Sequence, residues 1–250
     1  MGDQEIKVGI GIFARHPTPG RVKTRLARSV GDEAAADFYR ACAEHVIAQV
    51  VGCARHGCPV TVFCSRADEQ AAVTKWVRGA VKAAHVDVRP QSTTADLGDR
   101  MLAAMQDMVN AGCGAAIIVG TDVPDLTTEI VLASAAALRA DAEGHGAVLG
   151  PADDGGYYLV GSRAPIRREM FSGVPWSRAN TRAATLRAFA AAGLRTAPED
   201  ALPRLRDIDT FEDLQTWLEE RSEGDPHPLS DVATTTVARG VALMDVHGPV

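Results

Sequence analysis

The chain has 250 residues, of which 46% are hydrophobic, so it can bury a sizeable core as one large α/β domain or two small ones. Its net charge of −6 argues against a dedicated nucleic-acid binder, which usually carries a basic stripe. The sequence contains no run of about 18 apolar residues, so no membrane span is expected. The first residues lack the pattern of a signal peptide. Five scattered cysteines suit reduced thiols. We therefore expect a cytoplasmic protein that binds neither nucleic acid nor membrane.

Strands and helices are expected to alternate, which predicts an α/β fold with a mixed, mostly parallel sheet flanked by helices. The expected strands are residues 7–14, 60–64, 86–89, 115–119, 147–150 and 157–160. The expected helices are residues 32–55, 67–77, 97–111, 127–138, 178–192 and 211–220, with Asp32, Ser177 and Thr210 as N-caps of three of them. Residues 15–30 are expected to form a loop. We expect one domain over residues 1–222.

The remaining residues, 223–250, are polar, contain three prolines and lack a clear period. They predict a tail that is flexible or docks on a neighbour, with a short strand as one alternative for Val237–Met244. Such a tail makes a homodimer an expectation.

The loop after the first strand concentrates positive charge. Its cations are Arg15, Arg21, Lys23 and Arg25. Gly20 permits a close backbone approach, and Thr24 can donate a hydrogen bond. Because Arg binds phosphate oxygens in a bidentate fork and Lys acts as a point charge, the loop predicts a di- or triphosphate site. The spacing is not that of a Walker loop, and a solvated basic turn is the structural alternative.

The apolar run Ala115–Val119 predicts a strand buried on both faces. Gly120 frees the backbone at its end, and Asp122 follows at the edge where open α/β sheets bind ligands. An ionised Asp at that edge needs a partner, for which a hydrated divalent cation is suited. The structural alternative is that Asp122 caps the next turn, a task that Asp125 could perform instead.

A third loop, residues 150–158, reads Gly-Pro-Ala-Asp-Asp-Gly-Gly-Tyr-Tyr and again follows an expected strand. Gly155 and Gly156 would let the main chain approach a ligand. Asp153 or Asp154 could accept hydroxyl donors from a sugar or an acceptor. The alternative is a tight turn that needs two glycines for its shape.

Four acidic residues and a threonine surround the start of the last predicted helix. Thr210 and Asp213 have the spacing of a capping box, which explains those two structurally. Asp207 and Asp209 remain and could reach the same cation as Asp122. Two distant carboxylates that hold one Mg²⁺ between phosphates would suit phosphoryl chemistry.

Weaker signals come from two further places. Gly98 and Arg100 lie at an expected helix N-terminus, which favours anions, although a plain helix start is an equal alternative. Trp176 could form the wall of an acceptor pocket, although core packing is the more common role of such a residue. Cys53 and Cys58 bracket His56, but no fourth zinc ligand lies nearby.

Taken together, the loops resemble the glycosyltransferase-A-like family of nucleotide-diphospho-sugar transferases of the radical-SAM and selenodomain-associated type, within the wider nucleotidyltransferase-like group. The matching segments are Phe13–Leu26, Asp96–Met101, Gly120–Pro124, Gly150–Tyr158 and Asp207–Leu214. The likeness covers roughly residues 6–221. It implies a single Rossmann-like domain, with Asp122 and Asp209 at the positions of the family's metal carboxylates and the first loop as its phosphate-binding segment.

The resemblance leaves three functions open. In the first, Mg²⁺ or Mn²⁺ helps transfer a sugar from a nucleoside-diphosphate sugar to a small acceptor. Asp154 would orient or deprotonate the acceptor. The residues expected around the sugar or acceptor are Asp153, Gly155, Gly156, Tyr157 and Trp176. In the second, a phosphorylated small molecule attacks the α-phosphate of a nucleoside triphosphate and pyrophosphate leaves. In the third, the protein binds nucleotide without catalysis. We favour the first.

Overall fold

A computed structural model of the chain describes residues 6–81, 86–94, 96–140, 146–221 and 227–247. Its seven-stranded sheet has the order β3-β2-β1-β4-β6-β5-β7. The strands are β1 (Val8–Ala14), β2 (Val60–Cys64), β3 (Asp87–Pro90), β4 (Ala115–Val119), β5 (Gly146–Pro151), β6 (Tyr157–Arg163) and β7 (Arg195–Thr196). β6 runs antiparallel to β4 and β5, and the other pairs are parallel. The mixed, mostly parallel sheet expected from the sequence is confirmed.

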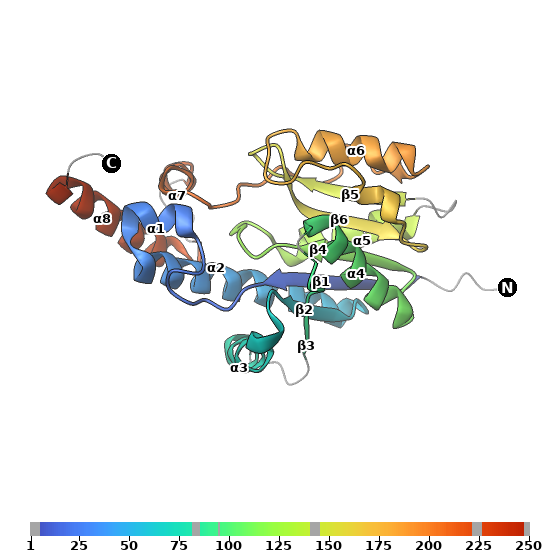
Figure 1. Cartoon of the computed structure of the whole chain (residues 1–250), viewed down its shortest axis with the longest axis horizontal. Coiled ribbons are helices and arrows are strands. Elements are labelled where there is room, and N and C mark those ends of the chain that lie inside the picture. Colours follow the sequence, from blue (N-terminus) through green and yellow to red (C-terminus); the bar gives the residue numbers. More distant parts are fainter. Residues whose placement is uncertain (1–5, 82–85, 95, 141–145, 222–226, 248–250) are drawn as a thin grey trace.

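The α-helices form layers on both faces of this sheet and a group at one edge (Figure 1). They are α1 (Thr24–Val30), α2 (Asp32–Gly52), α3 (Gln70–Val81), α4 (Leu97–Asn110), α5 (Thr128–Ala140), α6 (Thr181–Ala191), α7 (Phe211–Glu219) and α8 (Ser230–His247). The core on one face joins β1 and β4 to α2, α3, α5 and α7. The core on the other face contains side chains of α4 and α6.

The alternation in β1 shows how the sequence builds these two layers. Val8, Ile10 and Ile12 are fully buried on the α2 side. Glycines occupy the intervening positions, and a Cβ on Gly9 would lie 2.9 Å from the sulfur of Cys113, below ordinary contact. The missing side chains on this face therefore let the layer that contains α4 approach β1 closely.

The carboxyl end of β1 points toward a group formed by α1, α7 and α8 (Figure 1). The capping box predicted at Thr210 is confirmed: its hydroxyl accepts from the Asp213 N–H, and the Asp213 carboxylate accepts from the Thr210 N–H. This group of helices covers the edge of the sheet where ligands bind in α/β folds.

Several local expectations were wrong. Residues 24–30 form α1 rather than loop, and the short strand considered for Val237–Met244 is part of α8, which packs on α1, α2 and α7. Asp32 is the first residue of α2, whose N-cap is Gly31, and α6 begins at Thr181 after Asn180 rather than at a Ser177 cap. The expected division at residue 222 lies outside the described residues.

All five cysteines are free and buried. Within the described ranges, no helix is both long enough and apolar enough to cross a membrane.

Candidate functional site

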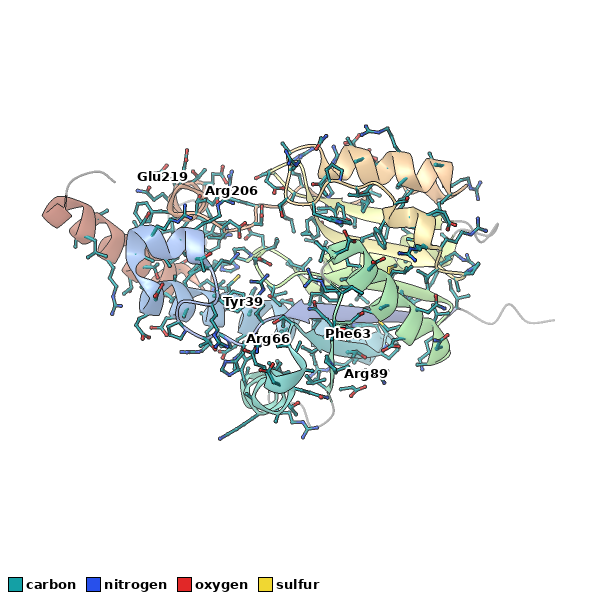
Figure 2. The ribbon with its side chains drawn as sticks, viewed as in Figure 1. Tyr39, Phe63, Arg66, Arg89, Arg206 and Glu219 are labelled. Atoms are coloured by element: carbon teal, nitrogen blue, oxygen red, sulfur yellow. The ribbon has the colours of Figure 1, made fainter. Side chains whose placement is uncertain are left out.

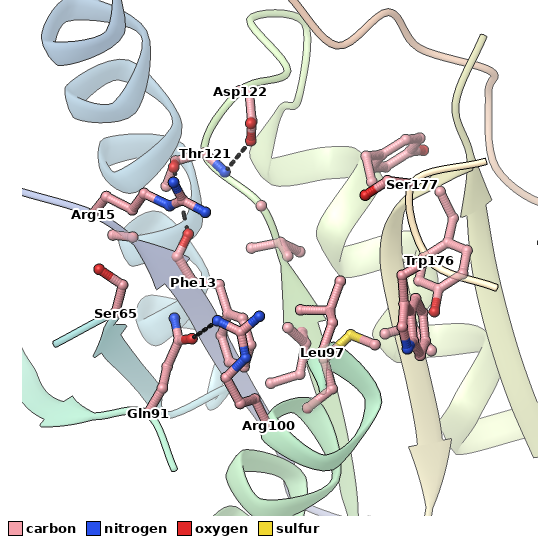
Figure 3. Close-up of a pocket in the computed structure, with 18 of the residues that line it drawn as sticks. Phe13, Arg15, Ser65, Gln91, Leu97, Arg100, Thr121, Asp122, Trp176 and Ser177 are labelled. Atoms are coloured by element: carbon pink, nitrogen blue, oxygen red, sulfur yellow. Dashed lines mark hydrogen bonds between the residues drawn. The ribbon is translucent and has the colours of Figure 1, made fainter. Parts of the chain in front are cut away.

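Three neighbouring cavities meet at the loop that follows β4. The largest, about 540 Å³, extends from Arg15 and Arg100 on one wall to Trp176 and Ser177 on the other (Figure 3). A second, about 200 Å³, is lined by Asp154 and Asp207, and a third, about 270 Å³, by Lys23, Arg25 and Asp209. Asp122 lines all three cavities. A ligand that extends from one of these cavities into another would therefore pass beside Asp122.

Lys23 joins the two carboxylates that the sequence analysis assigned to a metal. Its ammonium donates to Asp122 Oδ2 at 3.0 Å and to Asp209 Oδ1 at 2.7 Å. The Lys23 side chain is only 5% exposed, whereas both carboxylates are about two-fifths exposed. Residues separated by 99 and 186 positions in the chain are thus brought to one point.

Backbone contacts fix the segment that carries Asp207 and Asp209. The N–H of Ile208 donates to the Asp122 carbonyl at 3.0 Å, and the Ile208 side chain is fully buried. The Asp213 carboxylate accepts from the Asp209 N–H at 3.1 Å. The start of α7 and the acidic loop therefore hold one another in register.

The charges at this point stabilise one another. Burial opposes ionisation of Asp122, but the charge and hydrogen bond of Lys23, the Thr121 N–H and the charge of Arg15 favour it, and the net pKa of Asp122 is lowered. Burial likewise opposes the charge on Lys23, but Asp122 and Asp209 together raise its pKa above the ordinary value. Lys23 therefore forms an ion pair with Asp122, and the same ammonium also contacts Asp209.

The two carboxylates suit a divalent cation in part. Because both touch the same nitrogen, they are close enough to share one ion, and Mg²⁺ is commonly held by one or two carboxylates together with substrate phosphates. Within the described part of the chain, no group of three His, Cys, Asp or Glu residues has the arrangement of a metal site.

Tyr39 anchors the loop after β1 to the loop after β4. Tyr39, labelled in Figure 2, lies on α2, and Arg15 directly follows the last residue of β1. The Tyr39 hydroxyl lies 3.0 Å from the Arg15 N–H, which donates to it, and 3.1 Å from the hydroxyl of Thr121. Thr121 is buried and its N–H donates to Asp122 Oδ1 at 3.0 Å. These contacts fix the position of Asp122 beside the largest cavity.

Arg100 and Arg15 give the largest cavity its positive wall (Figure 3). Arg100 Nη1 donates to Gln91 Oε1 at 3.3 Å, and the buried Gln91 donates in turn to the Phe63 carbonyl at 3.1 Å. The buried Nε of Arg100 has no hydrogen-bond partner among the described residues. Burial and then repulsion by Arg15 lower the pKa of Arg100, so an anion between the two guanidinium groups would be stabilised.

The second cavity contains carboxylates and an indole. Its lining includes Asp154, Asp207, Tyr157 and Trp176. Burial, followed by the negative charges of Asp154, Asp209 and Asp122, raises the pKa of Asp207 to about 6. The Trp176 indole donates to Asp96 Oδ2 at 2.9 Å, so the predicted wall residue is held in place.

The turn around the two predicted glycines has structural functions as well. Gly155 has φ +85°, and a Cβ there would lie 2.0 Å from the Ala179 carbonyl oxygen. Asp154 Oδ1 accepts from the Gly156 N–H at 2.7 Å, which leaves its other oxygen available to the cavity. Asp153 lies 3.4 Å from Arg206 rather than on the lining of the second cavity.

The remaining predicted residues are distributed around the site. Arg25 Nη1 lies 3.5 Å from Asp209, and Thr24 is the first residue of α1. Gly20 has φ +74° beside the Asp32 carboxylate. Gly98 packs against Phe171 and Trp176, and a Cβ there would lie 2.7 Å from each of them. Gly98 therefore lets Trp176 approach α4.

Sequence reasoning missed Tyr39, Thr121 and Gln91 as site residues. Gln91 directly follows β3 and Thr121 follows Gly120 at the end of β4, so their positions after strands could have indicated them. Tyr39 gave no such signal because it lies among the buried residues of α2.

Comparison with solved structures supports the fold assignment. A crystal structure from Desulfovibrio desulfuricans G20, whose name assigns it provisionally to the nucleotide-diphospho-sugar transferases, is 28% identical, with a TM-score of 0.77 over 94% of this chain and 97% of that one. A cytidylyltransferase from Leptospira borgpetersenii serovar Hardjo-bovis (strain JB197) is 14% identical, with a TM-score of 0.54 over 94% of this chain and 96% of that one. A 4-diphosphocytidyl-2C-methyl-D-erythritol synthase from Anaerococcus prevotii DSM 20548 is 10% identical, with a TM-score of 0.52 over 87% of this chain and 100% of that one.

The chain thus has the Rossmann-like fold of transferases that use nucleotides. A search of curated proteins finds no match to it. A family model matches residues 48–178, and the chain belongs to that family, which is described as "Uncharacterized protein conserved in bacteria (DUF2064)".

Proposed function

We propose that the protein transfers a sugar from a nucleoside-diphosphate sugar to a small acceptor, with help from Mg²⁺ or Mn²⁺. The observation that carries the proposal is the position of Asp122 on all three cavities. The largest cavity is lined by arginines, the third by Lys23 and Arg25, and the second by carboxylates and an indole. A donor with an anionic half and a sugar half matches this succession of charges.

The diphosphate is assigned to the cationic side of Asp122. Arg15 lines both the largest cavity and the one that contains Lys23 and Arg25. Guanidinium groups bind phosphate oxygens through charge-assisted hydrogen bonds. Arg15 and Arg100, which repel one another across the cavity, would be stabilised by the anion between them.

The acceptor is assigned to the second cavity. Its hydroxyl would lose a proton to Asp154 or Asp207 while its oxygen bonds the anomeric carbon of the sugar. The bond from that carbon to the diphosphate oxygen breaks, and the nucleoside diphosphate leaves with the electron pair. Because its pKa is raised to about 6, Asp207 can accept a proton near neutral pH. Asp154 is oriented by the hydrogen bond that it accepts from the Gly156 N–H.

Asp122 and Asp209 are the residues that would hold the metal. When bound, a divalent cation would stabilise the negative charge on the leaving diphosphate. Asp122 is ionised by its surroundings, and the Asp213 contact to the Asp209 backbone keeps Asp209 beside it.

Nucleotidyl transfer is the second candidate, favoured by the shared fold of the cytidylyltransferase. A triphosphate needs more positive charge than a diphosphate. Arg21, however, pairs with Glu69 at 3.2 Å, and Arg25 lies 3.5 Å from Asp209. Part of the positive charge in this loop is therefore already compensated, which favours the shorter donor.

The test combines binding with product analysis. The protein is titrated calorimetrically with nucleoside-diphosphate sugars and with nucleoside triphosphates, each with Mg²⁺ and Mn²⁺, and turnover is followed by mass spectrometry. We expect a sugar nucleotide to bind and to release nucleoside diphosphate. Pyrophosphate release from a triphosphate would establish the second candidate instead. Binding of a sugar nucleotide with no turnover in any acceptor pool would favour a binding protein, and binding of no nucleotide would reject all three.

A further inference from the structure

Lys23 has an unusual environment for a residue assigned to phosphate binding. Its ammonium lies between two carboxylates and its side chain is almost fully buried. Its backbone is left-handed, with φ 46° and ψ 45°, a conformation that is uncommon for a residue other than glycine. Such a conformation persists where surrounding contacts determine it, and here Lys23 is the N-cap of α1, where its carbonyl accepts a hydrogen bond from the Ala27 N–H at 2.8 Å.

The same contact also stabilises the two carboxylates. Asp122 and Asp209 come from different loops, and their negative charges would repel one another without a cation between them. The ammonium therefore occupies the position that a divalent cation shared by these two oxygens would take. An ammonium and a divalent cation repel one another strongly at such distances, so both cannot occupy the position together.

Lys23 also lines the cavity that contains Arg15, Thr24 and Arg25. The same residue thus belongs to the carboxylate pair on one side and to the cationic cavity on the other. A Lys side chain carries a compact charge on a flexible four-carbon stem, so it can change its anionic partner without a change in the backbone.

We propose that Lys23 and a divalent cation exchange at the Asp122–Asp209 pair. Before the metal binds, the Lys23 ammonium holds the two carboxylates together. When the metal takes its place, the ammonium is released toward the cationic cavity, where it adds a charge for the phosphates. The assignment of phosphates to that cavity rests on the proposed function, but the exchange itself needs only the metal and this chain.

The first test measures metal affinity without nucleotide. Lys23→Met removes the competing ammonium and keeps a side chain of similar length. We expect calorimetry to show that Mn²⁺ binds at least tenfold more tightly to K23M than to the wild type. The matched control is Lys75→Met, which replaces an exposed lysine on α3. Its Mn²⁺ affinity should differ from that of the wild type by less than threefold. Equal or weaker Mn²⁺ binding to K23M would overturn the exchange.

A second measurement uses the wild-type protein, so it does not depend on the folding of K23M. An ammonium that is buried between carboxylates exchanges its protons slowly with water, and its ¹⁵N-bound protons are then visible by NMR. Lys23→Arg keeps the positive charge and assigns the signal by removing it. We expect millimolar Mg²⁺ to abolish or shift this signal in the wild type. A signal that stays unchanged while calorimetry shows Mg²⁺ bound would mean that Lys23 is a permanent structural partner.

These outcomes separate the exchange from the proposed function. If Mg²⁺ displaces Lys23 but no sugar nucleotide binds, the exchange stands and the proposed function fails. If a sugar nucleotide binds and reacts while Mg²⁺ leaves the Lys23 NMR signal unchanged, the function stands and the exchange fails.

Discussion

The carboxylate of Asp125 accepts a 2.8 Å hydrogen bond from the indole N–H of Trp217, which connects the loop after β4 to α7. Arg221 pairs with the same carboxylate and stacks over the Trp217 ring, with its guanidinium carbon 4.1 Å from the ring centroid. The acidic loop thus contains two aspartates with different tasks. Asp122 lines the cavities, and Asp125 attaches α7, the helix that begins two residues after Asp209.

Removing the indole N–H should weaken this attachment. Trp217→Phe keeps a buried aromatic ring but leaves Asp125 without its indole donor. Because a hydrogen bond to a charged group contributes about 1.5–3 kcal/mol, we expect the free energy of unfolding to fall by about that amount. Urea denaturation measures it. Asp37→Asn, which breaks the exposed Asp37–Arg40 pair, is the control and should cost less than about 1 kcal/mol. Equal losses in the two variants would contradict the attachment.

A histidine pair beside the same attachment predicts a pH dependence of stability. The rings of His45 and His227 have centroids 4.9 Å apart, and His227 also contacts Trp217. Burial lowers the pKa of His45, against a raising effect of Asp125. Burial, then Arg221 and His45, lower the pKa of His227. Both histidines are therefore harder to protonate in the folded protein than in the unfolded chain.

The sign follows from linkage. Below about pH 6.5 the unfolded chain binds more protons at these positions than the folded protein, so the free energy of unfolding should fall as the pH is lowered from 7 through 6 to 5. Denaturation at several pH values tests it. In His227→Gln the fall should be shallower than in the wild type. An identical slope in H227Q would show that the pair contributes nothing.

The turn at residues 153–156 gives a sharper prediction, because Gly155 can be compared with Gly57. Both glycines have a positive φ, but their surroundings differ. Gly155→Ala places a Cβ 2.0 Å from the Ala179 carbonyl oxygen, whereas Gly57 has φ +75° with no atom within 4 Å of the added Cβ. Gly57→Ala should lower the free energy of unfolding by about 1–2 kcal/mol, which is the cost of a left-handed backbone for a residue with a Cβ. Gly155→Ala adds a backbone clash and should cost about 3 kcal/mol or more. Thermal unfolding compares the two, and equal losses would show that the turn moves freely away from Ala179.

Local patterns were enough to predict most elements of this fold. β4 follows the apolar run Ala115–Val119 residue for residue, and the capping box at Thr210 follows from spacing alone. These features depend on neighbours within a few positions, so the sequence states them directly. The helix α1 was missed because prolines, glycines and charges dominate residues 15–30, while the helix is stabilised by packing against α2 and α8.

The site was predictable in its parts but not in its pairing. The position of Asp122 after a buried strand follows from the sheet architecture. That Lys23, rather than solvent or phosphate, lies between Asp122 and Asp209 depends on contacts across 99 and 186 residues, which no local pattern contains. The contact between Arg100 and Gln91 spans only nine positions, but it joins α4 to the residue after β3, and the pattern of a single helix or strand does not contain it.

The positive wall of the largest cavity provides the most direct test of anion binding. Arg100→Met removes the guanidinium, and a lost charge-assisted contact of about 1.5–3 kcal/mol corresponds to a loss of affinity of about tenfold to a hundredfold. We expect this loss for the nucleotide that the wild type binds, measured by calorimetry. Arg89→Met is the matched control, because Arg89 is 43% exposed and pairs with Asp87 at 2.7 Å. Unfolding curves must accompany both, since R100M also leaves the Gln91 carbonyl oxygen without its donor. An R100M protein that stays as stable as R89M and binds the nucleotide equally well would remove Arg100 from the site and leave Arg15 as the only guanidinium lining that cavity within the described residues.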